Sequence, residues 1–377
     1  MKGALRIMII MDIKLDNFLA FRDFSMSMSY PKRIVKSYIK DEFLSGYPNF
    51  RYKKIIIIMG TNATGKTSLG KMINHIFNFI NRKITDNLIS AICDKSKEAR
   101  FSIDFIPSDI SQNLHRIEAI FKLDMQTGET LIKALHKKVS IKKNDNYEKA
   151  KTRFLSIEDN FDDYISVLHD IPKFGFFFSY PMDVSPNTLP KGYNEKYNLI
   201  LECILKVLDT SIIKVEKLQE AQNSYNIHML DGRNILIQEG QTVETAPLSS
   251  GTKAGIAIAD IITAIKEKRN GFYYCDERFS YIHSDIERAI LAIMSELLGD
   301  NEQLFFTTHN LDILKMPFPK HSFSFLKKNI EDGKNYISCI NANDFLKRNT
   351  DSLRQAVEND LFSTAPDVNL LFKIKDI

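Results

Sequence analysis

The sequence has few cysteines, no long apolar run and no strong excess of one charge. Cys93, Cys203, Cys275 and Cys339 are far apart and form no CxxC pair. They therefore predict neither a disulfide framework nor a zinc site, and they fit a reducing cytosol. No stretch reaches the roughly 18 apolar residues of a membrane span, and the opening residues are too short for a secretory signal. We expect a cytoplasmic protein without a membrane partner.

The bulk composition is that of an ordinary globular protein. The chain has 377 residues, of which 44% are hydrophobic and 26% charged, and this length can bury one large core or two modest ones. A formal net charge of +4 permits contact with nucleic acid but does not by itself indicate it. We find no internal repeat and no low-complexity linker.

The most informative segment is the octet Gly60-Thr-Asn-Ala-Thr-Gly65-Lys66-Thr67, which directly follows the apolar run at residues 55–59. Glycines let the backbone N–H groups turn around phosphates, the lysine supplies a positive charge, and the Thr67 hydroxyl can bind a metal ion. Apolar residues then recur at helical spacing, so strand, loop and helix follow in the order of a phosphate-binding P-loop. The predicted nucleotide-binding residues here are Gly60, Thr61, Asn62, Ala63, Thr64, Gly65, Lys66, Thr67 and Ser68.

The segments around the P-loop predict antiparallel strands. Residues 11–28, where the ordered pattern begins, predict an edge hairpin, and residues 101–106, 117–123 and 130–139 predict three further strands with a turn at Thr127-Gly128. Between them lies a basic stretch, which predicts a solvated loop or, as the alternative, a nucleic-acid contact. Its basic residues are Lys32, Arg33, Lys36, Lys40, Arg51, Lys53 and Lys54.

The middle of the chain, residues 145–222, has a helical pattern that several prolines interrupt, and residues 193–218 are the stronger helical candidate. Within it, residues 176–181 are apolar enough for an interface, although a buried strand is the simpler interpretation. Residues 224–238 predict a hairpin around a two-residue turn at Asp231-Gly232.

Helices and strands alternate beyond residue 248. Residues 253–266 predict an apolar helix, 272–275 a buried strand, and 303–308 another strand. Residues 284–298 predict a helix with Ser284 and Glu287 as a capping box and Gly299 as its stop. This alternation predicts a parallel sheet with ligand groups at the carboxyl ends of its strands.

Three side chains stand at those strand ends. Asp276 and Glu277 close one strand; the aspartate would hold magnesium and the glutamate would polarise the attacking water. A DE pair can also simply mark where a strand meets solvent. His309 ends the next strand, where a ring N–H could bond a γ-phosphate, or where it is a structural residue.

Residues 248–252, Leu-Ser-Ser-Gly-Thr, precede the apolar helix. In isolation this segment is a helix N-cap. Because a helix N-terminus also binds anions, Ser249, Ser250 and Gly251 are further candidate nucleotide contacts.

In this order, the elements resemble the nucleotide-binding domain of ABC-type ATPases, and more closely the RecF/SMC/OLD branch than the transporters. Walker A is then residues 60–67, the signature loop 248–252, Walker B 273–277, the D-loop 280–283 and the switch histidine His309. The opening residues 13–21 and the switch strand 307–310 are similar to that branch as well. The resemblance covers most of residues 11–345.

The resemblance implies the fold, the cofactors and the mechanism. The fold would be α/β: a P-loop ABC-ATPase head, with an antiparallel lobe, a mainly parallel core sheet with flanking helices, and an inserted helical lobe. ATP and Mg²⁺ would be sandwiched between two copies. Lys66, Glu277 and His309 would act catalytically, Thr67 and Asp276 would hold the metal, and Ser249, Ser250 and Gly251 would reach the partner's nucleotide.

The sequence also departs from the transporter pattern. Ser250 replaces a glycine of the signature, and the D-loop ends in His283, as is common in the OLD branch. Gln112 is the candidate for the Q-loop glutamine. Only 68 residues follow His309, too few for the nuclease domain of complete OLD proteins, and 180 residues separate Thr67 from Leu248, too few for long coiled-coil arms.

We expect four segments: residues 1–144 with Walker A, 145–222 as the helical lobe, 223–345 with the other motifs, and 346–377 as a tail. The first hypothesis is a slow, Mg-dependent ATPase switch, a homodimer or higher oligomer that controls a separate effector (a nuclease or toxin) in anti-phage defence. The alternative is a RecF/SMC-like DNA-binding ATPase of DNA repair or chromosome processing. A transporter subunit and a scaffold with negligible turnover are further options.

Overall fold

The computed structural model describes residues 7–34, 37–107, 112–181, 195–219, 221, 223–238, 241–242, 249–268, 270–331, 333–346, 351–362, 372 and 374. The chain divides into two compact units. One, here called the Walker B unit, comprises Met1–Ile9, Pro107–Asp109 and Pro172–Thr308. The other, here called the P-loop unit, comprises Ile10–Ile106, Ile110–Ile171 and His309–Ile377.

An antiparallel sheet dominates the P-loop unit, with the strand order β2-β1-β6-β7-β8-β9. Its strands are β1 (Met8–Asp16), β2 (Phe24–Ser27), β6 (Ala99–Pro107), β7 (Asn113–Leu123), β8 (Thr130–Ser140) and β9 (Asp162–Asp163). The edge hairpin and the three further strands predicted from the sequence are confirmed. The first strand begins at Met8, three residues earlier than expected, because Met8, Ile9 and Ile10 are buried with the rest of the core.

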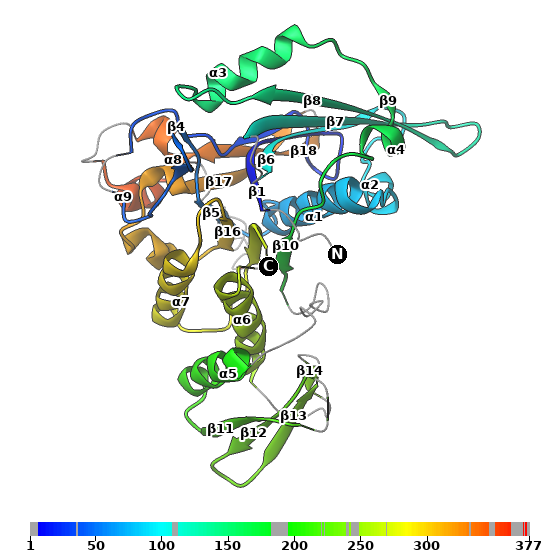
Figure 1. Cartoon of the computed structure of the whole chain (residues 1–377). Helices are drawn as coiled ribbons and strands as arrows, with labels where there is room; N and C mark the ends of the chain where they lie inside the picture. Colours follow the sequence, from blue (N-terminus) through cyan, green and yellow to red (C-terminus); the bar gives the residue numbers. More distant parts are fainter. Residues whose placement is uncertain are drawn as a thin grey trace. The chain divides into compact units, whose positions relative to one another are not determined.

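Helices cover both faces of this sheet. Figure 1 shows α1 (Lys66–Arg82) and α2 (Asp86–Ser90) on one side of β7 and β8, and α3 (Tyr147–Thr152) on the other. Phe79 of α1 packs its ring against Phe101 and Phe121, with centroids 5.6 and 5.7 Å apart. The helical spacing predicted after the P-loop is therefore the buried face of α1.

Two further groups of strands belong to the P-loop unit. β5 (Ile55–Met59) pairs in parallel with β17 (Phe323–Glu331), and β17 forms an antiparallel pair with β18 (Lys334–Asn341). β3 (Phe43–Leu44) and β4 (Tyr47–Arg51) form a short hairpin in the basic stretch.

Three parallel strands form the core of the Walker B unit: β10 (Phe176–Ser179), β15 (Phe272–Asp276) and β16 (Gln303–Thr308), in this order. Helices α6 (Ser250–Lys266) and α7 (Ser284–Leu297) belong to the same unit. The predicted strands at 176–181, 272–275 and 303–308 and the apolar helix at 253–266 are confirmed. β15 and β16 are wholly buried, which explains why they read as continuous apolar runs.

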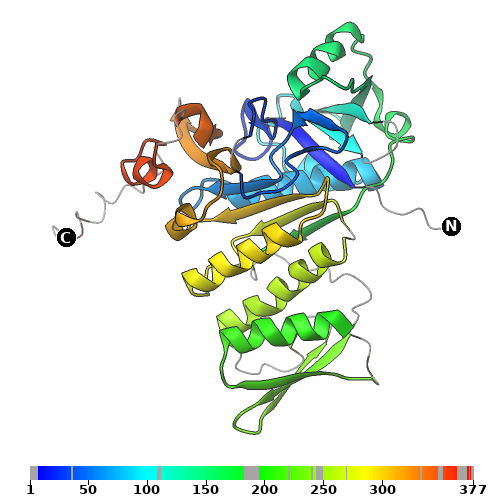
Figure 2. The ribbon, with the colours of Figure 1, turned by 60° about the vertical axis from the view of Figure 1, so that its left-hand side comes forward.

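The rest of the Walker B unit is a small mixed lobe. Helix α5 (Glu195–Leu208) contacts both α6 and a four-stranded sheet of β11 (Ile212–Lys217), β12 (Ser224–Met229), β13 (Asn234–Gln238) and β14 (Gln241–Thr242). Figure 2 shows α5 between α6 and this sheet.

The helical pattern predicted for residues 145–222 is confirmed only in part: α5 (Glu195–Leu208) lies within the stronger candidate at residues 193–218, but other parts of the segment form strands. The segment contains α3, a 3₁₀ turn (Arg153–Ser156), α4 (Tyr164–Val167) and α5, but also the strands β9, β10 and β11. The consecutive phenylalanines of β10 and the β-branched residues of β11 favour extended backbone, and this preference outweighs the helical pattern. The division of the chain into four segments stays a prediction.

Two local predictions also need correction. The β12–β13 loop has three residues, not two: Met229 pairs with Arg233, and Gly232 takes φ 83°, the left-handed residue of this loop type. Helix α7 confirms the predicted helix at residues 284–298 to within one residue, and with Leu298 as its C-cap it stops directly before Gly299. Its N-cap is His283 and not Ser284. Glu287 is buried, and its Oε1 accepts a hydrogen bond from Thr308 Oγ1.

The basic stretch is not uniformly solvated. Lys53 and Lys54 are only 2% and 3% exposed. Lys53 Nζ donates to Asn341 Oδ1 at 2.6 Å, and Lys54 Nζ to the Lys40 carbonyl at 3.1 Å. Burial lowers the pKa of Lys53 to about 8. These two lysines are structural, while Lys36 lies outside the described residues.

Candidate nucleotide-binding site

The P-loop leaves the buried strand β5 and enters α1, as the sequence predicts. The loop folds back on itself. Lys66 Nζ donates to the carbonyl oxygens of Gly60 (2.6 Å) and Thr61 (2.9 Å), and Thr64 Oγ1 donates to the Thr61 carbonyl at 2.8 Å. These contacts bring the lysine ammonium group to the centre of the loop.

The backbone of the loop requires its glycines. A Cβ at Gly60 would lie 2.6 Å from Thr64 Oγ1 and 2.8 Å from the carbonyl oxygen of Leu326 on β17. Gly65 adopts φ 95°, which side chains rarely adopt. A loop that packs this tightly keeps its shape, and that shape suits backbone binding of phosphates.

The N-terminus of α1 offers a second feature that fits an anion. Gly65 is the N-cap and provides no side-chain cap, and Leu69 N makes the first helical bond, to the Gly65 carbonyl. The amides of Lys66, Thr67 and Ser68 precede it in the first turn, where the helix dipole favours negative charge. Asn62 and Ala63 are exposed at the tip of the loop, and Thr67 and Ser68 are half-buried. The P-loop residues therefore fit the phosphates of a nucleoside triphosphate.

The Walker B carboxylates stand at the end of β15, in the other unit. Asp276 is fully buried, and its Oδ1 accepts a hydrogen bond from Thr307 Oγ1 at 2.6 Å. Glu277 follows in a left-handed conformation (φ 41°), and its backbone N–H donates to the same Thr307 oxygen at 3.0 Å. Sequence reasoning missed Thr307 as a site residue, although it lies only two positions before His309.

The signature residues begin helix α6. Ser249 is the N-cap, and its Oγ accepts a hydrogen bond from Thr252 N at 3.0 Å, while Ser249 and Ser250 are exposed. A Cβ at Gly251 would lie 3.2 Å from the Tyr281 carbonyl oxygen, so the signature and the D-loop are neighbours. Leu248 lies outside the described residues.

The remaining candidates are His309 and Gln112. His309 is exposed and directly follows β16, and Gln112 directly precedes β7. Lys66, Thr67 and His309 belong to the P-loop unit, whereas the Walker B and signature residues belong to the Walker B unit. Within the described part of the chain, no cluster of three or more His, Cys, Asp or Glu side chains is arranged as a metal site.

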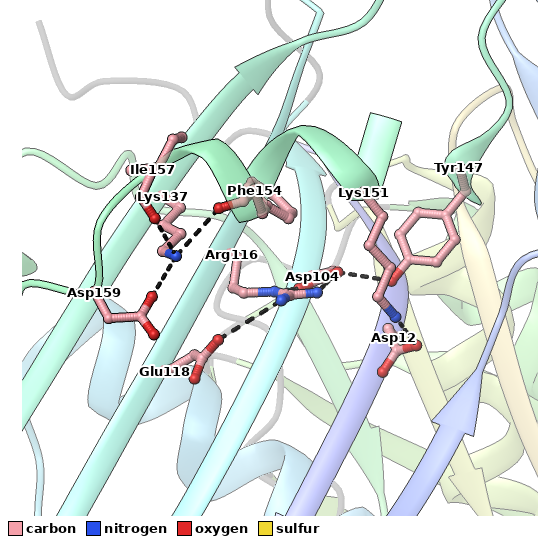
Figure 3. A network of polar contacts seen from close by, with 10 residues as sticks. All are labelled: Asp12, Asp104, Arg116, Glu118, Lys137, Tyr147, Lys151, Phe154, Ile157 and Asp159. Carbon is pink, nitrogen blue, oxygen red and sulfur yellow. Dashed lines mark hydrogen bonds and ion pairs between the residues drawn. The ribbon is translucent and has the colours of Figure 1, made fainter. Parts of the chain in front are cut away.

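A second group of buried charges lies on the α3 side of the antiparallel sheet (Figure 3). Arg116 binds Asp104 through two bonds, Nε–Oδ1 at 2.6 Å and a second to Oδ2 at 2.8 Å, and Tyr147 donates to the same carboxylate at 2.6 Å. Lys151 bonds Asp12 at 3.2 Å, and Lys137 bonds Asp159. These contacts fasten α3 and the following turn to the sheet.

The pKa values of the groups in this network shift in directions that agree with a structural role. Burial raises the pKa of Asp12, although Lys151 opposes the effect. Burial by itself would lower the pKa of Arg116, but the hydrogen bonds and charge of Asp104 raise it overall. Burial and the Asp104 charge raise the pKa of Tyr147, so its hydroxyl stays a donor.

No helix in the described part of the chain is both long and apolar enough to cross a membrane. No family model matches the sequence, and no curated protein matches it.

Solved structures do match. An SMC head domain with an extended coiled coil, derived from Pyrococcus furiosus and bound to the C-terminal domain of ScpA, has a TM-score of 0.50 at 12% identity, over 90% of this chain and 98% of that one. An SMC head domain from Pyrococcus yayanosii has a TM-score of 0.49 at 10% identity, over 90% and 99%. The recombination mediator RecF has 0.42 at 13%, over 89% and 99%.

At such identities the likeness shows the fold. The chain has the fold of an SMC head domain, which confirms the predicted α/β fold with its antiparallel and parallel sheets.

Proposed function

We propose that this protein is an ATP-binding and ATP-hydrolysing switch in which two copies enclose the nucleotide. The observation that carries the proposal is the P-loop of β5 and α1, with Lys66 at its centre and an uncapped helix N-terminus behind it. The head fold adds support, since a signature segment and a Walker B strand occur in the same chain.

The proposed roles follow from the chemistry of each side chain. Lys66 and the amides of residues 60–68 bind the phosphates, Thr67 and Asp276 hold Mg²⁺, Glu277 accepts the proton of the attacking water, and His309 contacts the γ-phosphate. When bound, Mg²⁺ would neutralise charge on the phosphate oxygens.

The signature segment acts in trans in this proposal. Ser249, Ser250 and Gly251 would bind the triphosphate held by the other copy, so that ATP joins the dimer and hydrolysis releases it. The exposure of Ser249 and Ser250 at the start of a helix fits such a contact.

Loss of the P-loop lysine is the first test. Lys66→Ala should abolish ATP binding, measured by calorimetry, because the phosphates lose their cationic partner. Lys71→Ala is the matched control, since Lys71 is an exposed lysine on the same helix. Normal ATP affinity in Lys66→Ala would contradict the proposal.

Mixing two inactive variants tests the action in trans. Ser249→Asp keeps a good N-cap but repels phosphate, and Lys66→Ala loses its own site. A mixed dimer contains one intact site, so the mixture should regain about a quarter of wild-type hydrolysis when half of the dimers are mixed. A mixture as inactive as its components would place the signature residues outside the partner's site.

We further propose that the switch controls a separate effector, a nuclease or toxin, in anti-phage defence and acts in the cytoplasm. Co-purification of the wild-type protein with its effector, and loss of the phage resistance of cells on Lys66→Ala substitution, would test this. Slow turnover is part of the proposal; an ATPase rate below detection would favour a nucleotide-dependent scaffold instead.

The alternative is a DNA-processing ATPase, and the likeness in fold to an SMC head favours it. The burial of Lys53 and Lys54 weakens the basic stretch as a DNA contact. A gel-shift titration against salt decides: binding to the phosphate backbone must weaken steeply as salt rises.

A further inference from the structure

We infer that Thr307 is a positioning residue for hydrolysis, which orients both Walker B carboxylates through a single hydroxyl group. This inference rests on the proposed function, since it concerns the same site.

The geometry places one hydroxyl between two functional groups. Asp276 of β15 and Thr307 of β16 are paired in the parallel register. Thr307 Oγ1 donates its one hydrogen to Asp276 Oδ1 at 2.6 Å, and its oxygen accepts the Glu277 N–H at 3.0 Å. The hydroxyl therefore acts as donor and acceptor at once, and Thr307 itself is fully buried.

The first bond fixes the Asp276 carboxylate. A carboxylate rotates freely about its last bond unless a partner holds it, and its rotation sets the directions in which its oxygens bind a metal ion. A hydroxyl orients the carboxylate without adding a positive charge that would compete with Mg²⁺.

The second bond fixes the backbone of Glu277. This residue has φ 41°, a conformation that costs a non-glycine residue on the order of 1–3 kcal/mol and that persists only where the surroundings enforce it. The bond from its N–H to Thr307 contributes to that enforcement. Because the side chain leaves the backbone in a direction set by φ, Thr307 also sets where the Glu277 carboxylate can reach.

The end of β16 is itself anchored. The next residue, Thr308, donates through Oγ1 to Glu287 Oε1 of α7 at 2.8 Å, and both are buried. Neighbouring residues of a strand point to opposite faces, so the strand end is held from both sides. The Thr307 hydroxyl therefore has a fixed position from which to hold Asp276 and Glu277.

The test compares Thr307→Val with Thr307→Ser. Valine keeps the shape but has no hydroxyl, while serine keeps the hydroxyl. Thr263→Val is the matched control, because Thr263 is a buried threonine of the same unit whose hydroxyl bonds only within α6, to the Ala259 carbonyl. For each full-length variant, the kcat of ATP hydrolysis, the Kd for ATP and the Mg²⁺ concentration for half-maximal rate are measured, with thermal unfolding as a check of folding.

We expect Thr307→Val to lower kcat about 10- to 100-fold, as small misplacements of catalytic groups do. It should raise the Mg²⁺ requirement several-fold and leave the Kd for ATP within about threefold, because the P-loop is intact. Thr307→Ser should restore kcat to within about threefold of wild type, and Thr263→Val should match wild type.

Two results would overturn the inference: a folded Thr307→Val with wild-type kcat and Mg²⁺ dependence, or a folded Thr307→Ser as impaired as the valine variant. Either leaves the proposed ATPase function in place. A wild-type protein that does not hydrolyse ATP would overturn both.

Discussion

Two regions of this protein hold their buried carboxylates in different ways. On the α3 side of the antiparallel sheet, Asp104 meets the guanidinium of Arg116, and Asp12 meets the ammonium of Lys151. At the end of β15, Asp276 accepts a hydrogen bond from the neutral hydroxyl of Thr307.

The two contacts differ in the charge that each brings to the carboxylate. A carboxylate paired with a cation of its own chain has its charge compensated in the folded state, and the pair serves to fasten one element to another. A carboxylate oriented by a hydroxyl receives a direction but no compensating charge from that contact. The second arrangement suits a residue whose counter-charge arrives with a ligand.

The largest expected effect is a loss of ATP hydrolysis on substitution of Glu277, directly after β15. Glu277→Gln should lower the rate of ATP hydrolysis about 100-fold or more while ATP binding is retained, because the amide cannot accept the proton of the attacking water. Single-turnover kinetics with labelled ATP measure this. Hydrolysis at the wild-type rate would remove Glu277 from its assigned role.

Breaking the structural network should act on stability instead. Arg116→Met leaves the buried Asp104 carboxylate without its cation and should lower the free energy of unfolding by about 3–5 kcal/mol, measured in urea. The kcat of the folded variant should stay within about twofold of wild type. Glu118→Gln is the control: Glu118 lies 3.7 Å from Arg116 and is one-third exposed, so its loss should cost less than about 1 kcal/mol. A variant of Arg116 that is stable but inactive would reverse the comparison.

The stability of the protein should depend on pH through His136, which lies on β8 of the same sheet. Burial, assisted by Lys138, lowers the pKa of His136 to about 4, whereas an unfolded histidine titrates near 6.5. Between these values the unfolded chain binds more protons, so the contribution of His136 to stability is complete above pH 6.5 and is lost as the pH falls toward 4, by up to about 3 kcal/mol. The difference in unfolding free energy between wild type and His136→Gln, followed from pH 7 to 4.5, measures it. A difference that does not change with pH would contradict the lowered pKa.

The smallest expected effect separates the two roles of Ser249. Ser249→Ala removes the cap of α6 and should cost about 1 kcal/mol, whereas Ser249→Asp keeps the cap and should cost less than about 0.5 kcal/mol. Thermal unfolding distinguishes them. Equal destabilisation by both would show that the cap is not what Ser249 contributes to stability.

How much the sequence could predict differs between the same two regions. The P-loop, the strand ending at Asp276 and the strand before His309 were predictable, because each is a local pattern of apolar and special residues. The bond between Thr307 and Asp276 joins residues 31 positions apart, and only the pairing of β15 with β16 brings them together.

Long-range pairing also explains the wrong predictions. The helical pattern of residues 145–222 gave way to strands where β10 could pair with β15, and the N-cap of α7 proved to be His283 and not Ser284. In the basic stretch, Lys53 is buried because Asn341, far along the chain, offers an acceptor. Periodicity describes one segment at a time and carries no information about such partners.

The central claim is that ATP joins two copies of this chain. Sedimentation velocity of Glu277→Gln, with and without ATP and Mg²⁺, tests it directly. We predict a species of 43.4 kDa without nucleotide and a species of twice that mass with ATP and Mg²⁺. The same mass under both conditions, in a variant shown to bind ATP, would contradict the account.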